Sequence, residues 1–164
     1  MKLLNQQQIR QKIKRLAFQI LEQNLEENEI ILAGINNNGT AFAQLIYEQL
    51  IELTKIKITL VQVRLSPANP LESEIKLGLP TEEVNDKVII IVDDVANTGR
   101  TIFYAMKPLF NILPKKVEVA VLVDRQHKSF PIRVDYVGLS LATTLQEDIQ
   151  VNLKGVKEAE VLLN

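Results

Sequence analysis

The sequence predicts a single-domain α/β fold, in which a central, mostly parallel sheet is flanked by helices and carries a small hood region. Two runs of branched apolar residues, 88–92 and 117–123, are typical of strands buried on both faces of a sheet. Segments with helical apolar spacing alternate with such runs, which favours a parallel sheet wrapped by helices. The 164 residues suffice for one core, and no repeat or low-complexity tract divides them, so residues 1–164 are expected to form one domain.

The first third of the chain is predicted to contain two helices and two strands. From Ile9 to Leu21, apolar residues recur at helical spacing, while lysines and arginines lie on the other face. The segment Gly34–Gly39 holds two glycines and three asparagines, so we expect a turn-rich loop there. The predicted helices are residues 5–24 and 40–53, and the predicted strands are residues 30–33 and 56–63.

Residues 64–86 differ from the segments around them. They contain three prolines, one glycine and side chains of both charges, without a clear period. We expect a long mobile loop or flap, because long loops inside a compact domain are usually functional or disordered.

The remainder of the chain is predicted to contain one helix and several strands. A helix is expected over residues 101–111, and Pro108 should kink or end it because proline has no backbone N–H. The strand over 117–123 is followed by a short strand over 134–137, and residues 160–163 are expected to form an edge strand.

Composition excludes several classes of function. The net charge is −1, so no global basic field drives nucleic-acid binding, although a local patch is still open. The chain has no cysteine, and His127 is the only histidine, which excludes thiol catalysis and multi-histidine metal sites. The first residues are polar and no apolar run approaches the length of a membrane span, so we expect a cytoplasmic protein that does not bind membranes.

The segment after the first buried run carries the clearest functional pattern. Asp93 and Asp94 follow the run directly, and a short turn over 97–99 leads into a helix from Arg100. A strand that ends in a small polar turn and opens a helix leaves backbone N–H groups unpaired, which makes an anion site. A phosphate in this turn, beside two acids that can hold hydroxyls or a hydrated metal ion, indicates a sugar phosphate with a free diol.

These residues resemble a known family. The segment Val-Asp-Asp-Val-Ala-Asn-Thr-Gly-Arg-Thr (92–101) resembles the ribose-phosphate fingerprint of type I phosphoribosyltransferases. Residues 119–138 resemble the corresponding segment of the PyrR branch of that family, whose members regulate pyrimidine operons and act as uracil phosphoribosyltransferases. The resemblance extends over about residues 30–150.

The resemblance implies a site for 5-phosphoribosyl pyrophosphate (PRPP). Asp93 and Asp94 would hold the ribose hydroxyls, and Arg64 would assist catalysis from the start of the hood, residues 64–82. A Mg²⁺ ion would bridge pyrophosphate and ribose oxygens near the two acids, held through PRPP and water rather than by a protein cage. The other implied PRPP contacts are Ala96, Asn97, Thr98, Gly99, Arg100 and Thr101 around the 5′-phosphate, and Asn37, Asn38 and Gly39 around the pyrophosphate. The implied base-binding residues are Tyr136, Val137, Gly138 and Leu139.

The sequence departs from the family pattern at three positions. Asn38 stands where members usually carry Arg or Lys in the pyrophosphate loop, and we expect Arg64 to compensate for the missing charge. Leu139 stands where PyrR-like proteins usually have a basic residue. Asn97 replaces an acid that purine-specific members use, and an amide cannot act as a general base, which favours a pyrimidine such as uracil.

Two other functions stay open at this point. A PyrR-like regulator could sense a nucleotide or PRPP and bind RNA with weak or no catalysis, although the net charge disfavours strong RNA binding. A purine or orotate transferase could use the same fold, although Asn97 weakens the first and no extra cation for a carboxylate is evident near 136–141. Relatives usually form dimers, so a homodimer is expected by analogy.

Overall fold

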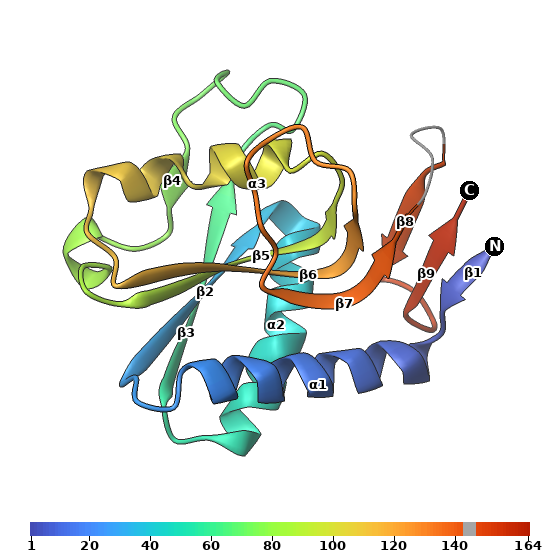
Figure 1. Cartoon of the computed structure of the whole chain (residues 1–164), viewed down its shortest axis with the longest axis horizontal. Coiled ribbons are helices and arrows are strands. Elements are labelled where there is room, and N and C mark those ends of the chain that lie inside the picture. The colour runs from blue at the N-terminus through green and yellow to red at the C-terminus, as the bar shows by residue number, and fades with distance from the viewer. Residues whose placement is uncertain (143–146) are drawn as a thin grey trace.

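The computed structural model describes residues 1–142 and 147–164, and it confirms the α/β class. A six-stranded sheet has the order β4-β3-β2-β5-β6-β7, and every neighbouring pair is parallel except β3 and β4 (Figure 1). Its strands are β2 (Glu29–Ile35), β3 (Lys57–Arg64), β4 (Lys76–Leu77), β5 (Val88–Ala96), β6 (Lys116–Arg125) and β7 (Tyr136–Leu141).

Helices cover both faces of this sheet. The long helices α1 (Gln6–Gln23) and α2 (Asn36–Leu53) lie on one face, and α3 (Arg100–Ala105) lies on the other (Figure 1). Successive residues of β5 point to opposite sides, so that Ile90 packs with α1 and α2 while Ile89 packs with α3. Both faces of the strand are therefore buried, which explains its unbroken apolar run.

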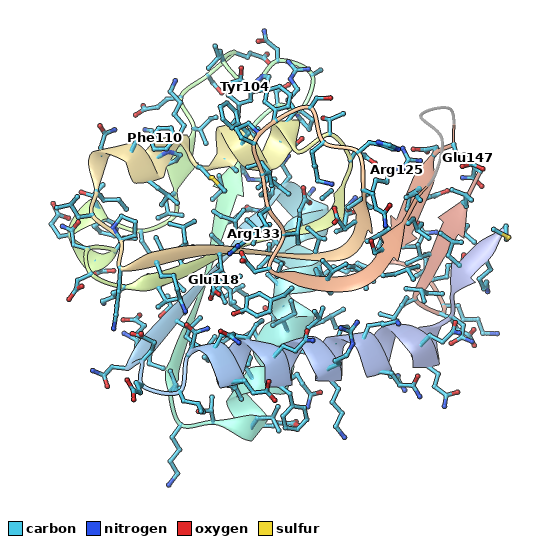
Figure 2. All side chains as sticks on the ribbon, in the orientation of Figure 1. Tyr104, Phe110, Glu118, Arg125, Arg133 and Glu147 are labelled. Atoms are coloured by element: carbon cyan, nitrogen blue, oxygen red, sulfur yellow. The ribbon has the colours of Figure 1, made fainter. Side chains whose placement is uncertain are left out.

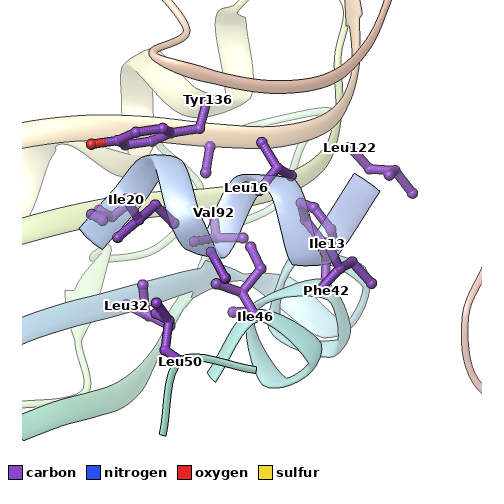
Figure 3. Packing of buried hydrophobic residues seen from close by; sticks show 14 of the residues in the cluster. Ile13, Leu16, Ile20, Leu32, Phe42, Ile46, Leu50, Val92, Leu122 and Tyr136 are labelled. Atoms are coloured by element: carbon purple, nitrogen blue, oxygen red, sulfur yellow. The ribbon is translucent and has the colours of Figure 1, made fainter. Parts of the chain in front are cut away.

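The core between α1, α2 and the sheet is densely apolar. Phe42, Leu16 and Ile46 are fully buried there, and Figure 3 shows their side chains gathered between the two helices and the strands. The amino end of α1 is fixed by a capping box, in which the Asn5 side chain accepts from Gln8 N and the Gln8 side chain accepts from Asn5 N, each at 2.9 Å.

The prediction of a turn-rich loop over Gly34–Gly39 is wrong. β2 continues to Ile35 and α2 begins at Asn36, whose φ of 50° turns the chain within one residue. The two glycines serve close packing instead. A Cβ at Gly34 would lie 2.5 Å from Thr40 Cα, and one at Gly39 would lie 2.6 Å from Val92 O. The glycines thus let the first turn of α2 lie directly against β2 and β5.

The helix expected over 101–111 is divided in two, as Pro108 suggested. α3 ends at Ala105, and a 3-10 helix, η2 (Lys107–Asn111), follows with the proline near its start. Residues 64–82 leave the sheet at the end of β3 and return to pair with it as β4, where Arg64 lies opposite Lys76. A second 3-10 helix, η1 (Thr81–Glu83), precedes β5.

A second, small sheet is formed by both ends of the chain. It has the antiparallel order β1-β9-β8, with β1 (Lys2–Leu4), β8 (Ile149–Asn152) and β9 (Glu160–Leu163), and it lies beyond the β7 end of the main sheet in Figure 1. The strand expected over 160–163 is present, but it is the central strand of this sheet and not an edge of the main one. The strands β1 and β8 were not expected from the sequence. Among the described residues, no helix has the length and apolar character needed to cross a membrane.

Candidate functional site

The polar residues singled out in the sequence gather at one edge of the main sheet. The chain proceeds outward from β2 through β3 in one direction and from β5 through β6 and β7 in the other. The carboxyl ends of β2 and β5 are therefore neighbours at a point where the strand order reverses. In open α/β sheets this is where ligands bind, because the loops on the two sides separate and leave a crevice.

A cleft of about 470 Å³ lies at this point. One wall comes from the end of β2 and the start of α2, and the opposite wall comes from the end of β5 and the turn after it. A second hollow of about 160 Å³ continues along that turn as far as Ile102. The cleft is lined by Ile35, Asn36, Asn37, Asn38, Pro67, Asp93, Asp94, Val95, Asn97, Thr101 and Ile149.

The two acids of the cleft differ in burial. Asp93 is 8% exposed and accepts from the backbone N–H of Asp94 at 2.9 Å, while Asp94 is half-buried and accepts from Val95 N at 2.9 Å. Burial, followed by the negative charge of Asp94, raises the pKa of Asp93 well above its ordinary value. Two carboxyl groups this close favour a partner that brings hydroxyl donors or positive charge.

The turn after β5 is arranged as an anion site. Gly99 has a φ of 85°, which few other residues adopt, and its carbonyl accepts the first hydrogen bond of α3, from Phe103 N at 2.9 Å. Within the described part of the chain, the backbone N–H groups of Asn97, Thr98 and Gly99 have no acceptor. These donors border the smaller hollow, which therefore suits a phosphate group.

A following loop holds this turn in place. Ser129 N and Phe130 N both donate to Thr98 O, at 2.9 and 3.2 Å. Lys128 forms a largely buried ion pair with Asp124 at 2.6 Å, and its stem packs close to Gly99. The phosphate turn is thus fixed by residues about 30 positions later in the chain.

The opposite wall contains the three asparagines, and they have different surroundings. Asn36 exchanges hydrogen bonds with the backbone of Leu65, donating at 2.9 Å and accepting at 3.0 Å. Asn37 accepts from Arg64 Nη2 at 3.4 Å, which places the predicted catalytic arginine beside the cleft. Asn38 is exposed and has no hydrogen-bond partner among the described residues. The Asn36 amide is therefore used to hold β3 against α2, and it is not free for a ligand.

The four predicted base-binding residues lie apart from the lining of this cleft. Tyr136 is 2% exposed and donates to Glu118 Oε2 at 2.8 Å, so its side chain is not available to a base. Figure 2 places Glu118 and Arg125 toward opposite ends of β6, and the cleft is at the carboxyl end. Figure 3 shows the Tyr136 ring within the apolar cluster. Burial and then Glu118 raise the pKa of Tyr136.

The backbone of the same segment is also occupied. Arg15 Nη2 donates to the carbonyl oxygens of Val137 and Gly138, at 3.0 and 2.8 Å. A Cβ at Gly138 would lie 2.4 Å from Leu122 O, and Leu139 packs against the core between the sheet and α1. The apolar residues that do line the cleft are Ile35, Pro67, Val95 and Ile149. Nothing in the local sequence distinguishes Ile149, because it reaches the cleft through the unpredicted strand β8.

The donors of the cleft fit a hard divalent ion that is bound mainly by a ligand. The described residues contain no cluster of three or more acidic, histidine or cysteine side chains. Asp94 offers a half-buried carboxylate at the cleft, and carboxylate oxygens suit Mg²⁺. Asp94 is therefore a residue that would help to hold such an ion beside a bound ligand.

The fold and this cleft together define a class of protein. The family model of the phosphoribosyl transferase domain matches residues 2–160, so the chain belongs to the phosphoribosyltransferase family. Curated relatives include the Bifunctional protein PyrR of Clostridium acetobutylicum, which is 36% identical over 97% of this chain and 93% of its own length. The Bifunctional protein PyrR of Streptococcus pneumoniae is also 36% identical, over 94% and 91%. The resemblance found in the sequence is thereby confirmed.

Solved structures agree on the fold. The hypoxanthine phosphoribosyltransferase of Trypanosoma cruzi has a TM-score of 0.76 at 18% identity, covering 99% of this chain and 95% of that one. A hypoxanthine-guanine phosphoribosyltransferase of Bacillus anthracis has a TM-score of 0.71 at 23% identity, covering 87% and 84%. At these identities the likeness concerns the fold, and it does not extend to the base that is bound.

Proposed function

We propose that this protein transfers the 5-phosphoribosyl group of PRPP to a nucleobase, with release of pyrophosphate, and that the base is uracil. The observation that carries the proposal is the cleft at the reversal of strand order, which joins the acid pair to a turn of unpaired backbone N–H groups. One ligand that needs both features is a sugar phosphate with a free diol.

In this proposal each wall of the cleft has one task. Asp93 and Asp94 accept hydrogen bonds from the ribose hydroxyls, and the 97–101 turn with Thr98 and Thr101 holds the 5′-phosphate. Asn37, Asn38 and Gly39 at the start of α2 face the pyrophosphate, and Arg64 lies beside Asn37. A base nitrogen attacks C1 of the ribose as the C1–O bond to pyrophosphate breaks, through an oxocarbenium-like transition state.

The chain needs no nucleophile for this reaction. Positioning of the two reactants and stabilisation of the leaving group supply the catalysis. Bound Mg²⁺ would neutralise the pyrophosphate as its negative charge grows. Residues 64–82 begin beside the cleft, where Pro67 is part of the lining, and we propose that they cover it and exclude water that would otherwise hydrolyse PRPP.

Two observations support a pyrimidine. Asn97 lines the cleft with an exposed amide, and an amide cannot take a proton from a purine ring. The relatives at 36% identity carry the name PyrR, whereas the purine-specific likenesses are below 25% identity. Because the Tyr136 side chain is buried and the Val137 and Gly138 carbonyls accept from Arg15, we propose that the base packs against Val95 and Ile149.

The test is pyrophosphate release from PRPP and Mg²⁺ with uracil, hypoxanthine, guanine and orotate in separate reactions. Turnover with uracil that is lost in the double variant Asp93→Asn/Asp94→Asn would support the proposal. Turnover with a purine alone would overturn the choice of base. Absence of PRPP binding in the unmodified protein would overturn the function itself.

A second function is favoured by the uncharged wall at the start of α2. Asn36, Asn37 and Asn38 bring no positive charge to the pyrophosphate, and the Asn36 amide is committed to Leu65. A PyrR-like regulator that senses PRPP or a nucleotide and binds RNA would tolerate such a wall. Saturable PRPP binding without turnover of any base, together with salt-dependent binding of a pyrimidine-operon leader RNA, would favour it.

Sedimentation of the purified protein would test the expected homodimer.

A further inference from the structure

The proposed pyrophosphate site lacks a positive charge where one would be most useful. Pyrophosphate carries several negative charges, and hydrogen bonds from charged donors are about twice as strong as those from neutral ones. At the start of α2 the side chains available are the amides of Asn37 and Asn38. Arg64 reaches the Asn37 side of this segment only, where it donates to Asn37 Oδ1 at 3.4 Å.

A cation lies on the other side of the same two asparagines. A hollow of about 160 Å³ separates the start of α2 from the end of β8. It shares Asn37 and Asn38 with the main cleft, so the two spaces adjoin at these residues. The lining consists of Asn37, Asn38 and Ala41 from α2, and of Val151, Asn152, Leu153 and Lys154 from β8 and the turn after it.

The lysine of this hollow is not engaged elsewhere. Lys154 is exposed, and among the described residues it has neither an ion pair nor a hydrogen bond. Lys2 pairs with Glu160 in the same small sheet and Lys128 pairs with Asp124, whereas Lys157, like Lys154, has no ion pair among the described residues. An unpaired lysine beside an unpaired amide, Asn38, therefore forms a place where an added anion would meet two free donors.

We propose that Lys154 supplies the positive charge that Asn38 lacks, and that it binds the pyrophosphate group of PRPP and of the released product. This inference rests on the proposed function, since it adds a specificity-determining residue to the same cleft. The cation comes from the small sheet rather than from the start of α2. This part of the chain reaches the site at two points: Ile149 of β8 lines the main cleft, and Lys154 in the turn after β8 lines the adjoining hollow.

A lysine suits this position physically. Its charge is a compact ammonium at the end of a flexible stem, which can follow the pyrophosphate from PRPP to free product. Because Lys154 is exposed before the ligand binds, the empty protein does not bear the cost of a buried, unpaired charge. Lys154 and Asn38 also line the same hollow, so an anion bound there would meet both side chains.

The test is the affinity of Lys154→Met for inorganic pyrophosphate, PRPP, ribose 5-phosphate and UMP, measured by calorimetry with Mg²⁺. We expect about a tenfold loss for the first two, which corresponds to one charged contact, and less than a twofold change for the last two, which lack pyrophosphate. Lys154→Arg should retain most of the affinity. Lys157→Met is the matched control, because Lys157 is exposed in the same turn and lies outside the lining of both spaces.

Three results would overturn the inference in a protein that binds PRPP. They are unchanged pyrophosphate affinity in Lys154→Met, an equal loss in Lys157→Met, or an equal loss for ribose 5-phosphate. A second variant gives an independent check: Asn38→Arg in the Lys154→Met background should restore pyrophosphate affinity. Failure of the unmodified protein to bind PRPP would instead overturn the proposed function, so the two failures are distinguishable.

Discussion

Polar side chains have different surroundings at the two ends of the main sheet: the amino edge, where the parallel strands begin, and the carboxyl edge, where they finish. At the amino edge, Glu29 accepts from Lys87 at 2.7 Å and from Thr59 at 2.6 Å, and Glu118 accepts from Tyr136 and Asn24. At the carboxyl edge, Asp93 and Asp94 accept from the backbone N–H of the next residue, and among the described residues neither has a cationic partner.

This difference distinguishes polar side chains that stabilise the fold from those that are available to bind a ligand. The two acids of β5 repel each other, and the side chains of Asn38 and Asn97 have no partner among the described residues. A polar group paired within the protein stabilises the fold, whereas one that is left unpaired at a cleft can bind a ligand. Substitutions at each edge in turn test this difference.

The largest effect is expected from removing the acid pair. In Asp93→Asn/Asp94→Asn, the ribose hydroxyls lose both charged acceptors, and we expect kcat/KM for PRPP to fall by at least about 100-fold. Pyrophosphate release measures this, and circular dichroism provides the control for folding. A variant that retains more than a tenth of the activity would contradict the assignment of this edge to function.

The second effect concerns the buried polar group at the amino edge. Glu118→Leu leaves the buried Tyr136 hydroxyl without its acceptor and removes one of the acceptors of the Asn24 amide, so we expect the free energy of unfolding to fall by about 2–3 kcal/mol. Urea denaturation measures the change. Activity per folded molecule should be unchanged, and a selective loss of kcat would show that this edge also serves the site.

The third substitution is expected to raise the free energy of unfolding, whereas most substitutions lower it. Asp93→Asn removes the repulsion with Asp94 while keeping an oxygen for Asp94 N, so we expect a gain of about 1–2 kcal/mol at pH 7. Since the pKa of Asp93 is raised in the folded protein, its stabilising effect is present at low pH and is lost as pH rises above its ordinary value of 3.8. The gain should therefore vanish near pH 3. A gain that is constant from pH 3 to 7 would speak against repulsion as its cause.

The smallest effect should have the opposite pH dependence. Burial acts to raise the pKa of Glu29, but hydrogen bonds from Lys87 and Thr59 and the charges of Lys87 and Lys57 lower it overall. A lowered pKa contributes stability that is present above the ordinary value of 4.5 and is lost as pH falls below it. Glu29→Gln should cost about 0.5–1 kcal/mol at pH 7 and nothing near pH 3 in thermal unfolding. An equal cost at both pH values would assign the effect to packing.

The sequence identified the parts of the site that depend on short stretches of chain. The strand 88–92, the acids that follow it and the turn at Gly99 are adjacent in sequence, so their pattern was sufficient to predict the strand, turn and helix that the structure contains. Pro108 likewise ended its helix through a purely local effect.

The errors share a physical cause, which is contact between distant segments. The segment Gly34–Gly39 has the composition of a loop, but its glycines are there because α2 packs directly on β2 and β5. Tyr136 has the position of a base contact in the sequence pattern, but Glu118 and Asn24 hold its hydroxyl in the core. The approach of β8 to the cleft depends on its pairing with β9, which no local period indicates.

The small sheet makes the cleft sensitive to the ends of the chain. β1 pairs with β9, and the amino group of Met1 donates to Leu163 O across 162 positions in the sequence. Contacts between such distant segments close a long loop, which costs chain entropy. The wall that carries Ile149 and Lys154 therefore depends on the pairing of β9 with both β1 and β8. A purification tag on either terminus would displace the strands that support this wall. It would then change the affinity for a ligand although it contacts no residue of the cleft lining.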